Sequence, residues 1–537
     1  MKLRSILSGI LIVACLSTVI SSASAQNTAS AQNTASAQNT ASAQKTASAQ
    51  KTASAQNTTF AQNTASAQNT TSALPKLNRE QLAEDFQIAR HALEEGHSGI
   101  YRYTSKAEMD RVFDTAAKSL DHSMDALEFY RVLAPAVAAI KCGHTNVSAP
   151  EAVRKDINNT LAVLPFQVRV LNKQAFIFRD FSDLSNPENK QGALAGRLIR
   201  SINGVPASKI LAVMMAAVPA DGDVQSSREF RLSGWTFNNY LVTLLGISGP
   251  YEMVLVGADK KEQKLKVNGV ELPKLQQASK TRFRQDQGSE RGAELKFYDD
   301  GRIAKIAIYH FGGYADPEKK QDFRDFYKES FEAIHSEGAR ALIIDLRDNG
   351  GGEDELGQLL LSYLVDKPFK YYDDLVINSM SFSFSKYTAR PITVPEKLVE
   401  TRADGKVHAV GHPNWGIKQP NQPTFTGKVY ILINGGSFST TSEFLSQAHF
   451  HKRATFIGDE SAGGYYGNSS GIMPLVTLPN TKVGVRVPLL TYYMAVSGYK
   501  AAAHGIVPDY KIEYTIDDLL AGTDKDIGMA LRLARKD

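Results

Sequence analysis

The sequence predicts an α/β protein with a C-terminal core of mixed sheet and flanking helices, an N-terminal helical domain and a β-rich domain between them. From residue 303 onward, apolar runs alternate with amphipathic segments, which indicates a sheet with helices on its faces. Between residues 79 and 139, apolar residues recur at three- and four-residue spacing, as in amphipathic helices. Between residues 161 and 270, short apolar runs end in turn residues, as in strands.

Each region contains segments whose pattern assigns them to a helix or a strand. In the N-terminal region the predicted helices are Glu80 to Glu95, Lys106 to Leu120 and Met124 to Ile140. In the middle region the predicted strands are Leu161 to Leu171, Ala175 to Arg179, a run within Gly192 to Pro206 closed by an Asn-Gly turn, Tyr251 to Val256 and Gln263 to Val267. In the C-terminal region the predicted strands are Ile303 to Tyr309, Ala341 to Leu346 and Lys428 to Ile433, and the predicted helices are Lys320 to Ser336, Glu353 to Val365 and Thr440 to His451. Catalytic groups are then expected on loops at strand ends.

Residues 1–25 have the three parts of a secretory signal: Lys2 and Arg4, an apolar stretch from Ile6 to Ile20, and small residues at 23–25. We therefore expect an exported protein. The segment ending at Cys15 also resembles the lipobox of bacterial lipoproteins, so acylation of Cys15 is the alternative. The apolar stretch is shorter than the roughly 20 residues of a membrane-spanning helix, and no later stretch is longer, so no membrane span is predicted.

Residues 26–76 are predicted to be a low-complexity linker. From Gln26 to Ala73 a six-residue unit, Gln-Asn-Thr-Ala-Ser-Ala, occurs eight times with small variations. Phe60 is its only aromatic residue and it has no branched aliphatic residue, so it cannot build a core and is expected to be a disordered tether. An expansion with no role beyond spacing is the alternative.

Composition excludes several classes of function. The formal net charge of +5 includes four positive residues of the signal and the repeat tract, Lys2, Arg4, Lys45 and Lys51, so the folded part is close to neutral and no nucleic-acid partner is expected. The chain has two cysteines, Cys15 and Cys142, and the first lies in the signal segment, so no disulfide framework is available. No His-Glu-x-x-His occurs, and His449 and His451 point in different directions on a helix, so neither a metal nor a cofactor is expected.

A glycine-rich turn, Asp345-Leu-Arg-Asp-Asn-Gly-Gly-Gly352, follows one predicted strand and precedes a helix. Unpaired backbone N–H groups at such a position can face an anion. A tight turn with no ligand explains the same residues. A nucleotide is less consistent with them, because no Lys-Ser or Lys-Thr follows the glycines.

A second strand, turn and helix surrounds Ser439 in the segment from Tyr430 to Phe444. Thr440 and Glu443 have the spacing of a capping box, which predicts a helix that begins at about Thr440. Ser439 would then stand at the helix N-terminus, where N–H groups and the helix dipole could stabilise an oxyanion. An ordinary serine near a helix cap is the alternative.

Ser469 lies in a second Ser-containing motif, Gly-x-Ser-x-Gly at 467–471. A nucleophile elbow needs a strand before it and a helix after it. Here a Gly-Gly-Tyr-Tyr loop precedes the motif and an extended segment, Ile472 to Leu478, follows it, so Ser469 is not expected to be a nucleophile.

In this order and spacing, the two turns resemble the tail-specific, or C-terminal processing, serine peptidases. The resemblance includes Ser-Phe-Ser-Thr-Thr-Ser-Glu-Phe at 437–444, Gly-Asp-Glu-Ser-Ala-Gly-Gly at 458–464 and Gly-Ile-Val-Pro-Asp at 505–509, and it extends from about Leu77 to the C-terminus. By this likeness, residues 77–155 are the N-terminal helical domain, 156–270 a PDZ-like domain with 197–205 as its most typical stretch, and 280–537 the peptidase core.

The resemblance also implies roles for single residues. Ser-Lys members of the family carry a lysine where this chain has Gly464, whereas Gly143-His144-Thr145 resembles the segment of tricorn-like members whose histidine is the general base. Ser439 is then the nucleophile, His144 the base, and the N–H groups of Gly351 and Thr440 the oxyanion donors. The carboxylate that orients His144 is left open between Glu443 and Glu460. Cys142 stands where relatives often have Asp.

The implied function is an exported serine peptidase, periplasmic or extracellular, that hydrolyses peptides or unfolded protein chains without a cofactor. A catalytically silent protein that binds peptides or apolar ligands on the same fold is the alternative. Specificity is expected in loops such as Ser379 to Asn421 and in the PDZ-like groove. With an imidazole base of ordinary pKa, about 6.5, activity is predicted to rise through roughly pH 6 to 7.

Overall fold

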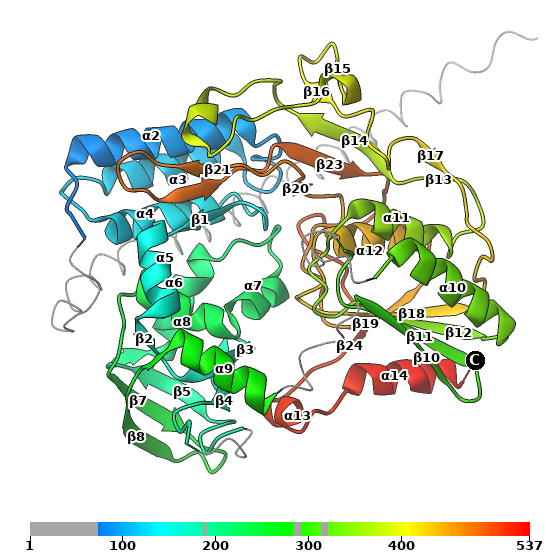
Figure 1. Ribbon diagram of the computed structural model, residues 1–537, viewed down its shortest axis with the longest axis horizontal. Coiled ribbons are helices and arrows are strands. Elements are labelled where there is room, and N and C mark those ends of the chain that lie inside the picture. The colour runs from blue at the N-terminus through cyan, green and yellow to red at the C-terminus, as the bar shows by residue number, and fades with distance from the viewer. Residues whose placement is uncertain (1–73, 186–190, 284–291, 313–320, 537) are drawn as a thin grey trace, which may run out of the picture. The chain divides into compact units, whose positions relative to one another are not determined.

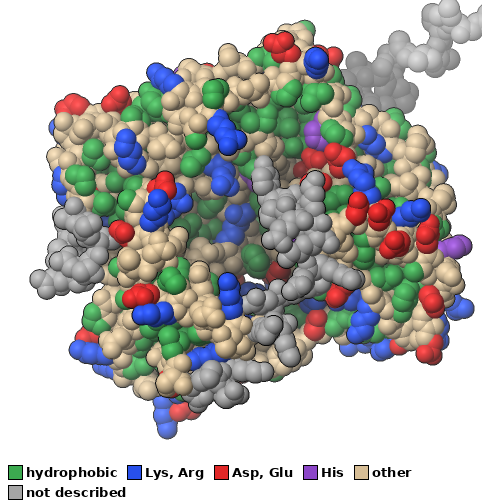
Figure 2. Space-filling model, viewed as in Figure 1, with side chains coloured by type: hydrophobic (Ala, Val, Ile, Leu, Met, Phe, Trp, Pro, Cys, Tyr) green, Lys and Arg blue, Asp and Glu red, His purple; other side chains and the backbone are tan. Residues whose placement is uncertain are grey.

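The computed structural model describes residues 74–185, 191–283, 292–312 and 321–536 (Figure 1). The predicted signal, Cys15 and the linker up to residue 73 lie outside the described residues. Within the described ranges, no helix combines the length and the apolar character that crossing a bilayer requires. On the face shown in Figure 2, positively and negatively charged side chains are interspersed.

The first described region is helical, as predicted. Its helices are α2 (Arg79–Gly96), α3 (Lys106–Lys118), α4 (Ala126–Ala138) and α5 (Glu151–Asn159). Reciprocal capping boxes begin the first three, since Asn78, Ser105 and Asp125 each accept a backbone N–H three residues ahead and receive a side chain in return. The three predicted helices are therefore confirmed within about two residues at most ends.

An antiparallel sheet follows, with strand order β3-β4-β5-β7-β8 and a short strand β6 beside β5. These strands are β3 (Phe166–Leu171), β4 (Gln174–Asp180), β5 (Leu198–Ile202), β6 (Val205–Pro206), β7 (Tyr251–Val256) and β8 (Glu262–Val267), and a separate pair is β2 (Ala162–Val163) with β9 (Val270–Glu271). Asn203 and Gly204 have φ of 49° and 76°, which suits the predicted Asn-Gly turn. The predicted strand Leu161 to Leu171 is wrong as one element, because it divides around Pro165 into β2 and β3.

Four helices in this middle region were not predicted from the sequence. They are α6 (Ala207–Ala217), α7 (Gln225–Leu232), α8 (Trp235–Thr243) and α9 (Leu272–Arg282). Helix α6 is apolar on most sides because it packs against α4 as well as the sheet, so its sequence lacks the polar stripe that marks a surface helix. The region from 156 to 270 is therefore mixed, and its assignment as a PDZ-like domain stays a prediction, as do the other domain boundaries.

The C-terminal core contains a six-stranded mixed sheet of order β10-β11-β12-β18-β19-β24. The strands are β10 (Ala293–Tyr298), β11 (Ile303–Ile308), β12 (Ala341–Asp345), β18 (Lys428–Ile433), β19 (Thr455–Gly458) and β24 (Tyr510–Lys511). Strand β10 is antiparallel to β11, and the other neighbours are parallel. The mixed α/β core predicted from the alternation of segments is confirmed.

Helices cover both faces of this sheet. They are α10 (Phe323–Ser336), α11 (Asp354–Ser362), α12 (Thr440–Phe450) and α14 (Lys525–Ala534), with a short α13 (Ile516–Leu520) before the last. Figure 1 shows α14 on one face and α10 to α12 on the other. Buried side chains such as Ile343, Leu432 and Ile457 pack against Ala530 of α14. Burial on both faces explains the continuous apolar runs of these strands.

Smaller sheets connect the N-terminal helices to the C-terminal half. Strand β1 (Asn146–Ser148) pairs with β22 (Gly484–Arg486), which pairs with β21 (Leu475–Thr477). A five-stranded sheet contains β14 (Tyr372–Ile377), β15 (Glu400–Thr401), β16 (Val407–His408), β20 (Ser469–Ser470) and β23 (Leu490–Met494). The remaining short elements are β13 (Phe369–Lys370), β17 (Ile417–Lys418), η3 (Ser383–Tyr387) and η4 (Glu396–Leu398).

Candidate active site

Ser439 occupies the turn between strand β18 and helix α12. Its backbone has φ 59° and ψ −126°, a combination that residues with a Cβ rarely adopt. A strained strand-to-helix turn is also the geometry that presents the nucleophile of α/β-hydrolases. Helix α12 begins at Thr440, as predicted, and the N–H of its first residue has no acceptor within the helix.

The predicted capping box at this helix is wrong. Ser439 is the N-cap residue and makes no side-chain capping bond. Glu443 points into the interior instead, where Tyr372 Oη donates to Oε2 at 2.6 Å and Asn468 Nδ2 donates to Oε1 at 2.7 Å. Helix α12 is buried along most of its length, so two interior donors take the carboxylate that a surface helix would use as a cap.

His144 meets Ser439 although the two residues are 295 positions apart. His144 lies in the turn between α4 and β1, and the distance from its Nε2 to Ser439 Oγ is 3.1 Å. Its ring also packs on that of Phe438, with centroids 4.5 Å apart and an angle of 31° between the planes. The pairing of β1 with β22 fixes the chain just after His144 to the C-terminal half. The structure therefore brings the predicted nucleophile and base within hydrogen-bond distance.

The surroundings of His144 favour a neutral imidazole. Burial, together with the positive charges of Arg231 and Arg486, lowers the pKa of His144 to about 3. Its Nδ1 is buried and has no hydrogen-bond partner among the described residues. A neutral ring whose Nε2 carries no proton can accept the hydroxyl proton of Ser439.

Neither candidate carboxylate is hydrogen-bonded to His144. Glu443 is occupied by Tyr372 and Asn468, and burial, then the nearby charge of Asp354, raises its pKa to about 7. Glu460 Oε1 lies 2.9 Å from His504 Nδ1 and accepts the N–H of Gly505 at 3.1 Å. Both residues therefore have other partners, and their role in orienting His144 stays a prediction.

The predicted oxyanion donors differ in availability. Gly351 lies against Ser439, since a Cβ on Gly351 would come within 2.7 Å of Ser439 Cβ. Its N–H, however, donates to Asn349 Oδ1 at 2.9 Å. Thr440 N–H, at the start of α12, has no such partner within the helix. Gly351 would have to release Asn349 before it could bind an oxyanion.

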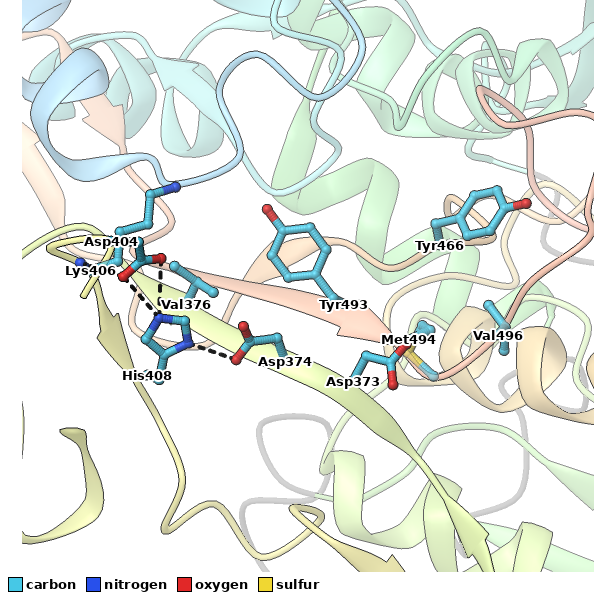
Figure 3. Close-up of a pocket in the computed structure, with 10 residues that line it drawn as sticks. All are labelled: Asp373, Asp374, Val376, Asp404, Lys406, His408, Tyr466, Tyr493, Met494 and Val496. Carbon is cyan, nitrogen blue, oxygen red and sulfur yellow. Dashed lines mark hydrogen bonds and ion pairs between the residues drawn. The ribbon is translucent and has the colours of Figure 1, made fainter. Parts of the chain in front are cut away.

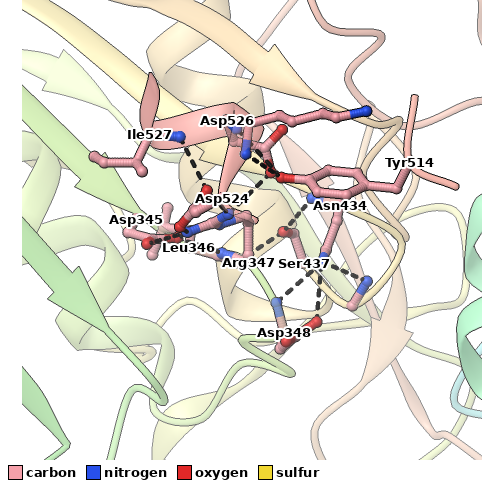
Figure 4. A network of polar contacts seen from close by, with 12 residues as sticks. Asp345, Leu346, Arg347, Asp348, Asn434, Ser437, Tyr514, Asp524, Asp526 and Ile527 are labelled. Atoms are coloured by element: carbon pink, nitrogen blue, oxygen red, sulfur yellow. Dashed lines mark hydrogen bonds and ion pairs between the residues drawn. The ribbon is translucent and has the colours of Figure 1, made fainter. Parts of the chain in front are cut away.

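The two glycine-containing turns are joined by polar contacts (Figure 4). Asp348 and Asn434 bond reciprocally: Asp348 N–H donates to Asn434 Oδ1 at 3.0 Å, and Asn434 Nδ2 donates to Asp348 Oδ1 at 2.8 Å. Ser437 Oγ donates to the carbonyl of Leu346 at 2.8 Å. These contacts hold the predicted oxyanion turn beside the turn that carries Ser439.

Arg347, in the same glycine-rich segment, is the centre of an ion-pair network that reaches the C-terminal helix (Figure 4). Its guanidinium lies 2.8 Å from Asp345, 2.7 Å from Asp524 and 3.0 Å from Asp526. These ion pairs join the end of β12 to the start of α14 and so attach the glycine-rich segment to the C-terminal helix.

Tyr103 lies against Gly464, the residue that the resemblance predicts in place of a lysine base. A Cβ built on Gly464 would collide with the Tyr103 hydroxyl. A side chain at this position would therefore have to displace Tyr103.

Three polar residues around the site were not identified from the sequence. Asp221 accepts the N–H of Gly143, Arg231 donates to the carbonyl of Gly143, and Asn349 binds Gly351. Asp221 and Arg231 belong to the middle region, where no motif and no predicted helix pointed to them. Only Asn349, inside the glycine-rich motif, could have been singled out from the sequence.

Ser469, in the second Ser-containing motif, lies in strand β20 and not at a strand-to-helix turn. Its buried Oγ is 2.8 Å from Thr491 Oγ1 of strand β23. The exclusion of Ser469 as a nucleophile is consistent with this position.

A separate pocket of about 470 Å³ lies on the five-stranded sheet (Figure 3). Asp404, Lys406 and His408 contribute to it, and they belong to the segment from Ser379 to Asn421 that was expected to carry specificity. His408 is held between carboxylates, with Nδ1 2.8 Å from Asp374 and Nε2 3.4 Å from Asp404. Across the described ranges, no group of three or more His, Cys, Asp or Glu side chains is arranged to hold a metal ion.

Comparison with known proteins gives the following likenesses. The sequence model of peptidase family S41 matches residues 302–512. A carboxy-terminal-processing protease of Bartonella bacilliformis is 32% identical over 100 residues, and this match spans 19% of the chain but only 21% of that relative's length. The structure of mature CPAF complexed with lactacystin has a TM-score of 0.57 at 16% identity and aligns over 86% of this chain and 99% of that one. A structure of mature CPAF has a TM-score of 0.55 at 14% identity over 85% and 96% of the two chains. These structural likenesses concern the fold.

Proposed function

Because the chain belongs to peptidase family S41, the tail-specific protease family, we propose that it is an exported serine peptidase with Ser439 as nucleophile and His144 as general base. The observation that carries this proposal is the 3.1 Å distance between His144 Nε2 and Ser439 Oγ at a strained strand-to-helix turn. That distance is within the reach that proton transfer between a base and a nucleophile requires.

The reaction is acyl transfer in two stages. Ser439 Oγ attacks the carbonyl carbon of the substrate peptide bond while His144 Nε2 takes the hydroxyl proton. The tetrahedral intermediate then expels the amine, which receives that proton, and an acyl ester remains on Ser439. Water, deprotonated by the same nitrogen, hydrolyses the ester and restores the serine.

The oxyanion of the tetrahedral intermediate would be bound by the N–H of Thr440 and, once Asn349 has moved aside, by that of Gly351. The N-terminus of α12 supports this, because its dipole favours negative charge. Either Glu443 or Glu460 is proposed as the carboxylate that orients His144, which requires one of them to exchange its present partners on substrate binding.

The substrate class is proposed to be peptides or unfolded protein chains in the periplasm or outside the cell. The secretory pattern of residues 1–25 supports export, with an acylated Cys15 as the alternative. The name of the Bartonella relative, a carboxy-terminal-processing protease, favours cleavage near chain ends.

A second candidate function is a catalytically silent protein that binds peptides or apolar ligands. Two observations favour it: His144 Nδ1 has no partner among the described residues, and the N–H of Gly351 is already engaged. The same observations would also fit a peptidase whose site is completed only when substrate binds.

Hydrolysis of a broad peptide panel by the full-length protein tests the choice between them. We expect turnover that is lost in Ser439→Ala with the fold intact, and labelling by a fluorophosphonate that is lost in the same variant. Retained turnover in Ser439→Ala would exclude Ser439, and the absence of both turnover and labelling would favour the binding protein.

A further inference from the structure

The peptide unit at Gly143, immediately before His144, is held from both sides. Its N–H donates to Asp221 Oδ1 at 2.6 Å, and its carbonyl accepts from Arg231 Nη1 at 3.2 Å. A Cβ on Gly143 would lie 2.7 Å from the Phe438 ring and 3.2 Å from Arg231 Nη2, so the close approach depends on glycine. The N–H and the carbonyl of Gly143, which orient the backbone just before His144, are thus both bound by charged side chains.

Asp221 connects this turn to the loop that follows strand β19. Its carboxylate is buried, with 1% of the residue exposed, and its second oxygen accepts the N–H of Gly464 at 3.2 Å. One carboxylate therefore joins the segment of His144 to the segment in which Ser-Lys peptidases carry their base. A buried carboxylate with two backbone donors is costly to replace, because each donor would lose its partner.

Arg231 connects the same turn to the segment of Ser439. Its guanidinium carbon lies 4.6 Å from the centre of the Phe438 ring, which packs on His144 and directly precedes Ser439. Burial on helix α7 lowers the pKa of the Arg231 guanidinium, and the charge of Asp221 opposes this shift. Asp221 and Arg231 thus both bind Gly143, and Arg231 also contacts the residue that precedes Ser439.

We infer that Asp221 and Arg231 are positioning residues that keep His144 Nε2 within proton-transfer distance of Ser439 Oγ. This inference rests on the proposed function, and it extends that function to the middle region, outside the matched residues 302–512. Neither residue is hydrogen-bonded to Ser439 or to the His144 ring, so Asp221 acts through Gly143, and Arg231 acts through Gly143 and Phe438.

Three charged or titratable groups face His144: Arg231 from α7, Arg486 from β22 and His97 at the end of α2, and all of them disfavour the imidazolium. Replacing Arg231 by a neutral residue of similar shape removes one positive charge. The His144 ring should then take up a proton at higher pH than in the wild-type protein. Loss of packing that admits water to the ring would raise the pKa of His144 as well, so the variant Arg231→Lys, which keeps the charge, is needed beside Arg231→Gln.

The kinetic test uses Asp221→Asn in the full-length protein, with Asp223→Asn as the matched control. Asp223→Asn removes the same charge two positions further along the chain. The Asp223 side chain, however, is half-exposed and bonds to Lys141 at 2.6 Å. We expect kcat of Asp221→Asn to fall by about tenfold to a hundredfold with KM little changed, because a small displacement of the base costs the chemical step. The control should retain nearly wild-type kcat. Wild-type kcat in a folded Asp221→Asn would overturn the inference.

The second test does not depend on turnover. The imidazole of His144 is followed by NMR in histidine-labelled protein, with its signal assigned by its loss in His144→Gln. In Arg231→Gln the ring should begin to protonate at higher pH than in the wild type, and Arg231→Lys should restore the wild-type behaviour. An identical titration in all three proteins would overturn the inference for Arg231. If the wild type neither turns over peptides nor reacts with a fluorophosphonate, the proposed function fails, while this titration still decides whether the charge of Arg231 acts on the His144 ring.

Discussion

The nucleophile side and the base side of the candidate site are built in different ways. Ser439 stands between consecutive elements, β18 and α12, so the local strand, turn and helix determine its backbone. His144 comes from a turn nearly 300 residues earlier and reaches Ser439 through β1, Phe438 and the contacts of Gly143. A nucleophile can therefore be found from local sequence, whereas the place of its base depends on long-range contacts.

Removing the nucleophile should have the largest effect. Ser439→Ala deletes the group that forms the acyl ester, so kcat should fall by roughly a thousandfold or more. Circular dichroism and a thermal scan of the same preparation serve as the folding control. Turnover within tenfold of the wild type would contradict this account, because the turn between β18 and α12 would then not carry the nucleophile.

Removing the base should have the next largest effect. His144→Ala should reduce kcat by about a hundredfold or more, the usual contribution of a general base. His122→Ala, at an exposed histidine in the same helical region, is the control and should be silent.

The pH profile distinguishes the sequence-based expectation from the structure. An ordinary imidazole predicts a rise in activity through about pH 6 to 7. Because burial and Arg231 lower the pKa of His144 to about 3, the neutral base is available at all pH values above that, and the rise should lie well below pH 6 in kcat/KM. A rise centred between pH 6 and 7 that disappears in His144→Ala would show that the imidazole is less buried in solution.

Glu443→Gln should change the pH dependence of stability. The folded-state pKa of Glu443 is raised to about 7 by burial, above its ordinary value of 4.5, so folding takes up a proton between these values. The associated stability is present below about pH 4.5 and is lost as pH rises through 7. Between pH 5 and 8 the wild type should lose on the order of 2 kcal/mol relative to Glu443→Gln. Urea unfolding of both proteins at pH 5 and pH 8 measures this difference in the free energy of unfolding. An equal change with pH in the two proteins would contradict a buried, protonated Glu443.

Gly464→Lys should destabilise the protein without supplying a base. The new side chain begins where the Tyr103 hydroxyl lies, and such overpacking typically costs about 1–3 kcal/mol. Combining it with Tyr103→Ala should recover part of the loss in the midpoint of thermal unfolding. Equal stability of wild type and Gly464→Lys would mean that the Tyr103 side chain can move aside at little energetic cost.

The smallest expected effect concerns the strain at the nucleophile. Ser439→Gly and Ser439→Ala both lack the hydroxyl, but only glycine adopts a φ of 59° with a ψ of −126° at little cost. Strain relief exceeds the extra entropy of glycine in the unfolded chain, so Ser439→Gly should be more stable than Ser439→Ala by about 1 kcal/mol. Chemical denaturation compares the two, and the opposite order would indicate an unstrained turn.

Much of the core fold could be predicted because its signals are local. Strand β18 and helix α12 follow directly from an apolar run and the small-residue turn after it. Helices α6 and α8 could not be predicted in this way, because their residues are mostly apolar or buried and leave no clear polar stripe. The division of β2 from β3 depends on Pro165, whose effect was masked by the apolar residues on either side.

The residues of the candidate site likewise differ in whether local sequence identifies them. Ser439 and the glycine-rich turn were found from motifs, and His144 was found only through a family resemblance. Asp221 and Arg231 could not be found, because their importance arises from contacts with Gly143 that span more than 70 residues of sequence. Glu443 was interpreted as a helix cap or an orienting carboxylate, yet its partners Tyr372 and Asn468 come from distant strands and loops.

The most direct test of the central claim, that Ser439 and His144 form one catalytic unit, is a double-mutant cycle on kcat. The account predicts that the Ser439→Ala, His144→Ala double variant loses no more activity than the worse single variant, because each residue acts only through the other. Losses that multiply would mean that the two residues work independently and would contradict it.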